Sequence, residues 1–291
     1  MGANTVIEPE RGDSVAGVLV DRMIVGSRPG ADADAVRVRV EEYGRGRTVV
    51  FLQGLVGLNV HWMPVVRRLR EHLRCVLVEI PLLELRGHAC SLEGVAGLVR
   101  PVLGTLGVDR LTLLGSSFGG HVAVRLTESD PGRVRGLVLA GASGLSERAL
   151  GWGGSELQIK PTREWVRGVF GAMFHDPKHI DEAELTRVHG ELIKREHARA
   201  IVRLTRSSRR DGLEARLPGL GVPTMLIWGR QDAVTPPEAC ERFASLLPRA
   251  RTAWIDRCGH APMVEHPDEF AACVLEFVRG LDPSGLSERN G

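Results

Sequence analysis

The segment Leu111-Thr-Leu-Leu-Gly-Ser-Ser-Phe-Gly-Gly120 decides the fold class of this chain. Its apolar first half is typical of a buried strand, and the small residues after it predict a tight turn into a helix over 118–128. A turn of this kind holds Ser117 at its apex in strained, left-handed backbone geometry. The positions two before and two after the serine must then be small, and Gly115 and Gly119 occupy them. The start of the following helix favours negative charge at the serine oxygen.

Two other interpretations of this turn compete with a reactive serine. A phosphate cradle or dinucleotide site would need Gly-x-Gly-x-x-Gly or a following Gly-Lys-Ser/Thr, and the segment has neither. The pair Ser116 and Ser117 could also do no more than cap the helix. The rest of the sequence has to decide between a cap and a nucleophile.

An aspartate and a histidine each follow a predicted strand further along the chain. The apolar run 222–229 ends in a turn just before Asp232, and after a predicted helix over 237–247 the strand 251–256 leads to Arg257-Cys-Gly-His260. The carboxyl ends of parallel strands meet at one edge of a sheet, so Ser117, Asp232 and His260 are expected to lie together there. Alone, such an aspartate is usually a turn former and such a histidine a surface residue, but the three in this order indicate a catalytic site.

Three motifs carry a resemblance to a known family: Gly115-Ser-Ser-Phe-Gly119, Trp228-Gly-Arg-Gln-Asp232 and Cys258-Gly-His260. With them the chain resembles the α/β-hydrolase fold serine hydrolases, esterases and lipases among them, from about Val36 to Val278. The resemblance implies an α/β fold with a mostly parallel eight-stranded sheet flanked by helices and a helical cap insertion. It says little about the substrate, because this fold hosts many reactions.

The chemistry of the three residue types fits covalent catalysis. A serine hydroxyl attacks well only when a base removes its proton, and imidazole suits that exchange at neutral pH. Ser117 is therefore the expected nucleophile and His260 the general base. Asp232 is expected to orient His260 and to stabilise its charged form.

The resemblance also implies an oxyanion hole made by the backbone N–H groups of Phe118 and Leu55. Leu55 lies in the loop after the strand that begins at Thr48, where most relatives have His-Gly and this chain has Gln53-Gly54. Since glutamine both donates and accepts hydrogen bonds, Gln53 is expected to brace the loop in place of the histidine. A second departure is the leucine-rich segment 81–87, which forms either an apolar wall of the pocket or ordinary core.

The alternation of strands and helices predicts four segments: a first core part over 1–143, a helical cap over 144–216, a second core part over 217–280 and a flexible tail over 281–291. Strands near 17–25 and 35–42 are expected to pair like a hairpin. Within the cap, helices are predicted over 162–174, 182–193 and 196–209. Trp152, Trp165 and Phe174 are candidates to contact the substrate, although each could instead belong to the core of the cap.

Four arginines, Arg203, Arg206, Arg209 and Arg210, are spaced to share roughly one side of the last cap helix. The ordinary interpretation is a solvated basic face. The alternative is a site for an acidic substrate tail or for an acyl-carrier partner.

Composition sets the remaining expectations. A chain of 291 residues with 43% hydrophobic residues can bury a large core, and a net charge of +2 gives no indication of nucleic-acid binding. The N-terminus lacks the pattern of a signal peptide and no apolar run is long enough to span a membrane, so a soluble, cytoplasmic protein is expected. The five scattered cysteines predict free thiols, with Cys258 a packing residue rather than a metal ligand. No cofactor and no metal are expected, and the excess of arginine over lysine hints at a GC-rich bacterial genome.

Several functions are compatible with these residues. The leading one is hydrolysis of a carboxylic ester, thioester or lactone through an acyl-enzyme, with a small acyl compound as substrate. Carbon–carbon bond hydrolysis is an alternative, although the Gly-Pro-Gly-like loop usual in such relatives is missing from Leu55-Val-Gly-Leu58. Perhydrolase activity and a ligand-binding protein that retains the three residues are further alternatives. Dehalogenases and epoxide hydrolases need an aspartate where this chain has Ser117, which disfavours both.

Overall fold

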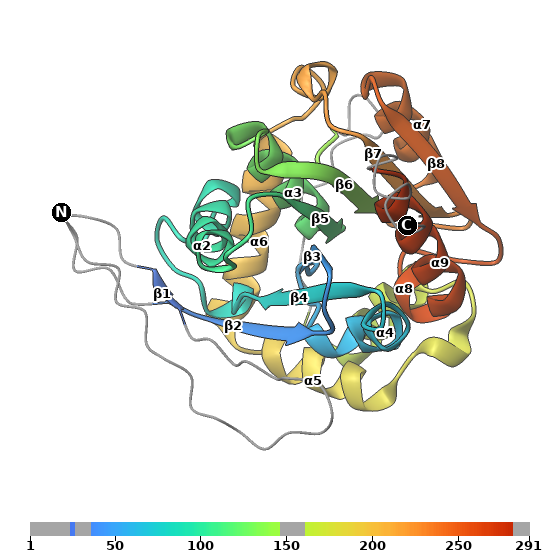
Figure 1. Cartoon of the computed structure of the whole chain (residues 1–291). Helices are drawn as coiled ribbons and strands as arrows, with labels where there is room; N and C mark the ends of the chain where they lie inside the picture. Colours follow the sequence, from blue (N-terminus) through green and yellow to red (C-terminus); the bar gives the residue numbers. More distant parts are fainter. Residues whose placement is uncertain (1–23, 27–35, 146–160, 282–291) are drawn as a thin grey trace, which may run out of the picture.

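The computed structural model describes residues 24–26, 36–145 and 161–281 (Figure 1). Within them, seven strands form one mixed, mostly parallel sheet, and the three-residue strand β1 extends it to eight in the order β1-β2-β4-β3-β5-β6-β7-β8. β1 is antiparallel to β2 and β2 to β4, whereas all other neighbours are parallel. The predicted α/β fold with a mostly parallel sheet is confirmed. The strands are β1 (Ile24–Gly26), β2 (Val36–Tyr43), β3 (Arg47–Leu52), β4 (Leu73–Glu79), β5 (Leu111–Ser116), β6 (Val134–Ala140), β7 (Thr224–Gly229) and β8 (Ala250–Ile255).

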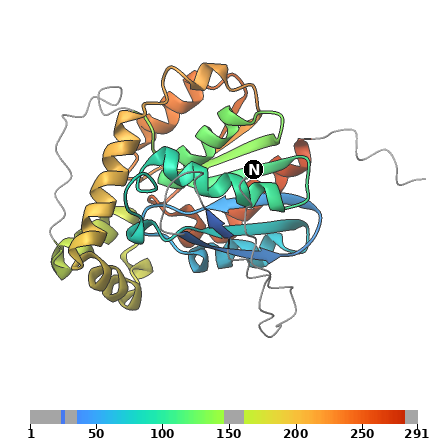
Figure 2. The ribbon, with the colours of Figure 1, turned by 90° about the vertical axis from the view of Figure 1, so that its left-hand side faces the viewer.

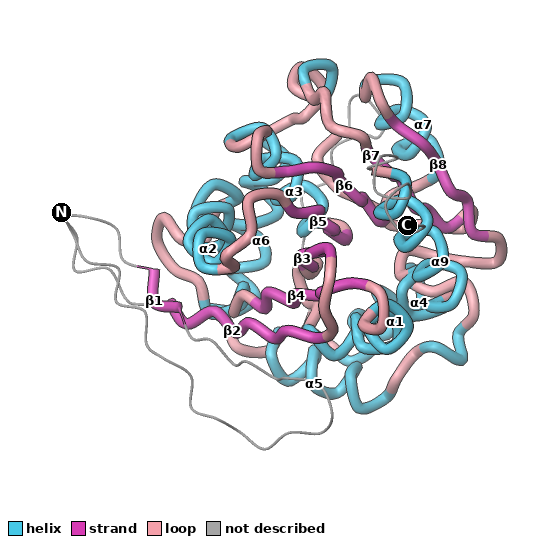
Figure 3. The backbone as a smooth tube through the Cα atoms, viewed as in Figure 1, coloured by secondary structure: helices cyan, strands magenta, loops and turns pink. Residues whose placement is uncertain are grey.

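Helices cover both faces of the sheet because its central strands are apolar on both sides. In β3, Val50 and Leu52 pack on one face, while Val49 and Phe51 alternate with them and pack on the other. The first face is covered by α2 (Leu92–Thr105), α3 (Phe118–Ser129) and α7 (Pro237–Leu246). The second is covered by α1 (Met63–Leu69) and α9 (Pro267–Gly280), which pack against each other. Figure 3 shows the helices as an outer layer around the strands.

A helical insertion separates β6 from β7. Its helices are α4 (Arg163–Met173), α5 (Glu182–Leu192) and α6 (Arg195–Arg210), each within one residue of the predicted bounds at both ends. They share a small apolar cluster of their own, built from Val166, Phe170, Leu185, Val188, Leu192 and Ile201. Figure 2 shows the insertion, in yellow and light orange, beside the core formed by the sheet and the helices that cover it.

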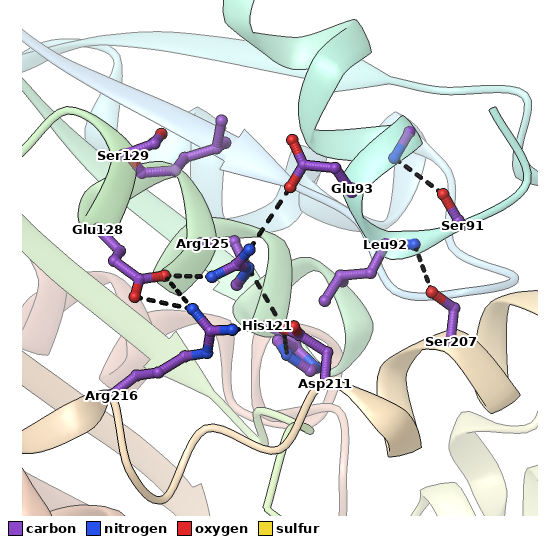
Figure 4. A network of polar contacts seen from close by, with 12 residues as sticks. Ser91, Leu92, Glu93, His121, Arg125, Glu128, Ser129, Ser207, Asp211 and Arg216 are labelled. Carbon is purple, nitrogen blue, oxygen red and sulfur yellow. Dashed lines mark hydrogen bonds and ion pairs between the residues drawn. The ribbon is translucent and has the colours of Figure 1, made fainter. Parts of the chain in front are cut away.

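The end of the insertion is fastened to α3 by a polar network (Figure 4). The fully buried ring of His121 lies 2.8 Å from Ser208 Oγ and 3.1 Å from Asp211 Oδ2. The hydrogen bond from His121 and the nearby charge of Arg125 lower the pKa of Asp211. Because α3 begins directly after Ser117, the insertion is anchored on the helix that follows the predicted nucleophile.

The last two residues of the predicted first strand belong to β1, which pairs with β2 in antiparallel fashion as a hairpin would, and its other residues lie outside the described part of the chain. The other end of the described chain differs from the prediction. Leu281 falls in the predicted tail, yet its side chain packs against β6 so closely that a Cβ added at Gly136 would lie 2.7 Å from it. Trp152 lies outside the described residues.

Candidate active site

The turn between β5 and α3 has the predicted strained geometry. Ser117 has φ 52°, in the left-handed region, and its side chain is partly exposed. A Cβ at Gly115 would lie 2.3 Å from the carbonyl oxygen of Gly119, and one at Gly119 would lie 2.3 Å from that of Leu52. Only glycine permits this approach of β5, α3 and β3, which fixes Ser117 at the apex.

His260 and Asp232 form a buried pair at the neighbouring strand ends. Asp232 follows β7 and His260 follows β8, and they are 2% and 4% exposed. Nδ1 of His260 lies 2.9 Å from Oδ2 of Asp232. The other carboxylate oxygen, Oδ1, accepts hydrogen bonds from the backbone N–H groups of Val234 and Thr235, both at 2.8 Å. These donors hold the carboxylate in one orientation toward the imidazole.

The loop after β6 lies between this pair and Ser117. The N–H of Ser117 donates to the carbonyl of Ala140, and Ser143 donates its N–H to the carbonyl of Ser117, both at 3.0 Å. Between them, a Cβ at Gly141 would lie 2.9 Å from His260 Nδ1 and 3.2 Å from Asp232 Oδ2. Residues from β5, β6, β7 and β8 therefore meet at one edge of the sheet, as the sequence predicted for Ser117, Asp232 and His260.

Thr235 is a polar neighbour of the pair that the sequence analysis missed. Its hydroxyl lies 2.9 Å from Asp232 Oδ2, 3.0 Å from the carbonyl oxygen of Gly141 and 3.1 Å from His260 Nδ1. The Thr235 hydroxyl can donate its proton to Asp232 Oδ2 or to the carbonyl oxygen of Gly141. Its own oxygen can accept a hydrogen bond from the imidazole N–H of His260. The available signal was the short spacing from Asp232, since an aspartate often binds N–H groups two and three residues later.

The loop after β3 approaches Ser117 from the other side. A Cβ at Gly54 would lie 3.4 Å from Ser117 Cβ. The buried side chain of Gln53 donates from Nε2 to the carbonyl of Ile80 at 2.9 Å, so it braces the loop as expected. Within the described chain, no recorded hydrogen bond uses the N–H of Leu55 or of Phe118. The assignment of these two N–H groups to an oxyanion hole stays a prediction.

The insertion contacts the loop after β3 through Arg187 on α5. Its guanidinium donates to the carbonyl of Val56 at 3.0 Å and pairs with Glu184 at 2.6 Å. Glu184 also faces His61 at 3.3 Å. Burial alone would raise the pKa of Glu184, but the hydrogen bonds from Arg187 and His61 outweigh it and lower that pKa to about 2.

The candidate substrate residues lie on the insertion at its apolar cluster. Trp165 and Phe174 are both partly exposed and pack against this cluster, together with Leu55, Val56 and Leu83 from the core. Within the leucine-rich segment 81–87, Leu82 and Leu85 are buried in a core cluster that also includes Ala200 and Leu204 of α6, and Leu83 packs against the apolar cluster of the insertion.

A second missed residue, Glu265, lies close to His260. Its carboxylate is 8% exposed and accepts a hydrogen bond from the N–H of Gly259 at 2.6 Å. The same carboxylate binds the N–H groups of His175 and Asp176, at the end of α4. No local pattern marks a residue whose partners lie about ninety positions away in the chain.

Cysteine and metal chemistry have little support at the site. Cys258 is fully buried, and burial, followed by the charge of Glu265, raises the pKa of its thiol. Among the described residues, no cluster of histidine, cysteine, aspartate and glutamate side chains could hold a metal ion.

None of the helices in the described part of the chain combines the length and the apolar character that a membrane span requires.

We expect Thr235→Val to lower kcat/KM for p-nitrophenyl acetate by about tenfold, because a hydrogen bond to a charged group is worth about 1.5–3 kcal/mol. Thr235→Ser keeps the hydroxyl and should stay within about threefold of the original enzyme. Steady-state kinetics, at a temperature well below the Tm of each variant, measure kcat/KM for both variants. An unchanged rate in Thr235→Val would show that the hydroxyl has no part in orienting the pair.

Comparison with known proteins agrees with this geometry. The sequence profile of the Alpha/beta hydrolase family matches residues 49–273. The chain is 29% identical over 272 residues to a 2-hydroxy-6-oxononadienedioate/2-hydroxy-6-oxononatrienedioate hydrolase of Paraburkholderia phymatum, covering 84% of this chain and 91% of the relative. It is 26% identical over 268 residues to a pimeloyl-[acyl-carrier protein] methyl ester esterase of Nitrosomonas europaea, covering 81% and 97%.

A solved structure is similar as well. An alpha/beta hydrolase enzyme from the metagenome of lagoon sediments at Mar Chica, Morocco, has a TM-score of 0.66 and 30% identity, with 84% of this chain and 95% of that chain covered. The family profile covers well over half of the sequence, and the relatives are bacterial or metagenomic enzymes. The chain belongs to the alpha/beta hydrolase family and is a serine hydrolase.

Proposed function

We propose that this protein hydrolyses a carboxylic ester, thioester or lactone through an acyl-enzyme. The observation that carries the proposal is the buried pair of His260 and Asp232, 2.9 Å apart, beside the strained turn that exposes Ser117. In this arrangement Ser117 is the nucleophile, His260 the general base and Asp232 the group that orients it.

The reaction follows from these roles. Ser117 Oγ attacks the acyl carbonyl carbon as His260 takes its proton, and the resulting oxyanion accepts hydrogen bonds from the N–H groups of Phe118 and Leu55. His260 then gives the proton to the leaving oxygen or sulfur, which departs as an alcohol or thiol. Water, deprotonated by His260, attacks the acyl-serine and releases the carboxylic acid and Ser117.

The helical insertion acts as a cap in this proposal. Its residues 161–216 would cover the site, and their apolar cluster lies against Leu55 and Val56 in the loop that approaches Ser117. Trp165 and Phe174 are the aromatic side chains at this boundary. An apolar cap face fits the acyl chain of a substrate and excludes water during the reaction.

Carbon–carbon bond hydrolysis is the second candidate, supported by the similarity to the Paraburkholderia phymatum enzyme. Substrates of that enzyme carry carboxylate groups, according to its name. In this chain the apolar residues Leu55, Val56, Trp165 and Phe174 line part of the boundary, and the nearby Arg187 is already paired with Glu184. This boundary favours an apolar acyl group over an acidic dienoate.

A labelling experiment with a substrate panel tests the proposal. Ser117→Ala should abolish covalent labelling by a fluorophosphonate and lower esterase turnover by several orders of magnitude, because the nucleophile is lost. The panel contains p-nitrophenyl esters, lactones, acyl thioesters and 2-hydroxy-6-oxo dienoic acids. We expect faster turnover of esters or thioesters than of the dienoic acids.

Ser116→Ala serves as the matched control and should keep both labelling and turnover. His260→Ala should cost about as much as Ser117→Ala, and the double variant should be little worse, because residues that act as a unit are not additive. Labelling that persists in Ser117→Ala contradicts the assignment. Turnover of the dienoic acids alone would replace the ester proposal with carbon–carbon bond hydrolysis.

Substitution of the boundary aromatics tests the role of the cap. Trp165→Ala or Phe174→Ala should shift the preferred acyl chain length while labelling of Ser117 continues, since one methylene in an apolar pocket is worth about 1–3 kcal/mol. A series of p-nitrophenyl esters from acetate to decanoate measures the shift. Loss of labelling together with loss of folding would instead identify the residue as part of the structural core.

A carrier-linked acyl thioester or ester is a narrower form of the proposal. A groove of about 620 Å³ on α6 is lined by Arg195, Ala198, Arg199, Val202, Arg203 and Arg206. The arginines at 195, 199 and 203 are exposed and repeat every four residues, which places them on one face of the helix. This face suits an acidic carrier protein, and the similarity to the Nitrosomonas europaea esterase supports the same class of substrate.

Charge reversal tests for such a carrier. The double variant Arg199→Glu with Arg203→Glu should raise KM for an acyl-[acyl-carrier protein] by about tenfold or more, while an acyl-pantetheine thioester reacts as before. Arg67→Glu with Arg70→Glu, two exposed positions at α1, applies the same charge change elsewhere as the control. Equal KM values for the carrier substrate in both double variants would rule out this docking surface.

A further inference from the structure

The carboxylate of Glu265 joins two segments that the sequence keeps apart. Glu265 is the last residue of α8 (Pro262–Glu265). Its Oε1 accepts the N–H of Gly259, and its Oε2 accepts the N–H groups of His175 and Asp176 at 2.9 and 3.1 Å. One buried side chain thus binds both the loop that carries His260 and the turn that ends α4 of the insertion.

The backbones of these two segments also touch directly. The N–H of His260 donates to the carbonyl of Met173 at 2.7 Å. A Cβ at Gly259 would lie 2.5 Å from the carbonyl oxygen of Met173 and 2.8 Å from the nitrogen of His175. The main chain next to the imidazole therefore rests on residues 173–175 with no space between them.

The histidine loop needs such support because part of its backbone is strained. Arg257, three residues before His260, has φ 51°, which a non-glycine residue adopts only when its surroundings hold it there. No cation is recorded as paired with Glu265 among the described residues, so its three N–H donors and the neighbouring Cys258 side chain help offset the cost of burying the carboxylate. Two of those three donors come from the insertion.

We propose that Glu265 is a positioning residue that couples the seating of the insertion to the placement of His260. The inference rests on the proposed function, in which His260 is the general base. When residues 173–176 are seated on the histidine loop, Glu265 fixes the main chain on both sides, and Nδ1 of the imidazole faces Asp232. Phe174, in the middle of this segment, packs against both the core and the apolar cluster of the insertion. A substrate that contacts Phe174 would therefore press on the segment 173–176 that supports the histidine loop.

Two variants break the bridge in different ways. Glu265→Gln keeps the size of the side chain but has one acceptor oxygen, which cannot serve both segments. Glu265→Asp keeps the charge but is shorter by one methylene and cannot reach both. Each should lower kcat for p-nitrophenyl acetate by about tenfold or more with KM changed less than about twofold, because the placement of the base changes and not the binding of substrate.

A second readout reports on His260 itself. The proton on Nδ1 shared with Asp232 gives a far-downfield proton NMR resonance, which should broaden or disappear in both Glu265 variants at temperatures well below their Tm. Asp256→Asn is the matched control, since it removes an acidic side chain that lies in the same loop but is 77% exposed. That variant should keep both the resonance and kcat. Wild-type kcat and an unchanged resonance in the Glu265 variants would overturn the proposal, whatever their Tm.

The insertion side offers an independent test if the Glu265 variants do not fold. Asp176→Pro deletes one of the N–H donors, whereas Asp176→Ala removes only the side chain. We expect kcat to fall at least about threefold further in the proline variant, and equal values in the two would also overturn the proposal. The variant His260→Ala distinguishes failure of the proposed function from failure of the coupling. If His260→Ala keeps wild-type turnover, the proposed function is wrong. If it is inactive while the Glu265 variants are normal, only the coupling through Glu265 is wrong.

Discussion

The approach of α3 to β3 through Gly119 determines where the other groups of the active site can lie. No side chain fits between Gly119 and the carbonyl of Leu52, so the helix start and the strand end are held at backbone contact. This contact forces Ser117 into its left-handed conformation and brings Gly54 within reach of the serine. The strain at Ser117 is thereby maintained by the close packing of α3 against β3 and β5.

The insertion is joined to both loops that complete the site. Arg187 binds the carbonyl of Val56 in the loop after β3, and the turn 173–176 supports the loop that carries His260. At its far end the insertion is fastened to α3 through His121. The insertion therefore contacts the elements that hold Ser117, His260 and Leu55, the residues proposed as nucleophile, base and oxyanion donor. In the proposed function, a change in how the insertion packs would act on all three.

The sequence predicted those parts of the structure that short-range patterns specify. The turn at Ser117 needs small residues at fixed spacing, and the insertion helices repeat apolar residues with helical period, so both could be recognised locally. Asp232 and His260 could be placed because parallel strands end at the same edge. Glu265 escaped prediction because its contacts with His175 and Asp176 exist only in the folded chain, whereas Thr235 was missed although its short spacing from Asp232 was a usable signal. Arg187 escaped for the same reason as Glu265, since its partner Val56 is 131 positions away.

Gln53 shows how a departure from the family pattern can still preserve the site. A histidine at this position would titrate near neutral pH, and its hydrogen bond would change with its charge. The amide of Gln53 cannot titrate, and its Nε2 donates to Ile80 whatever the pH. Its buried Oε1 has no recorded partner among the described residues, so the brace is made by donation alone. The hydrogen bond that braces the loop between Gln53 and the carbonyl of Ile80 is consequently made by a group whose charge does not vary with pH.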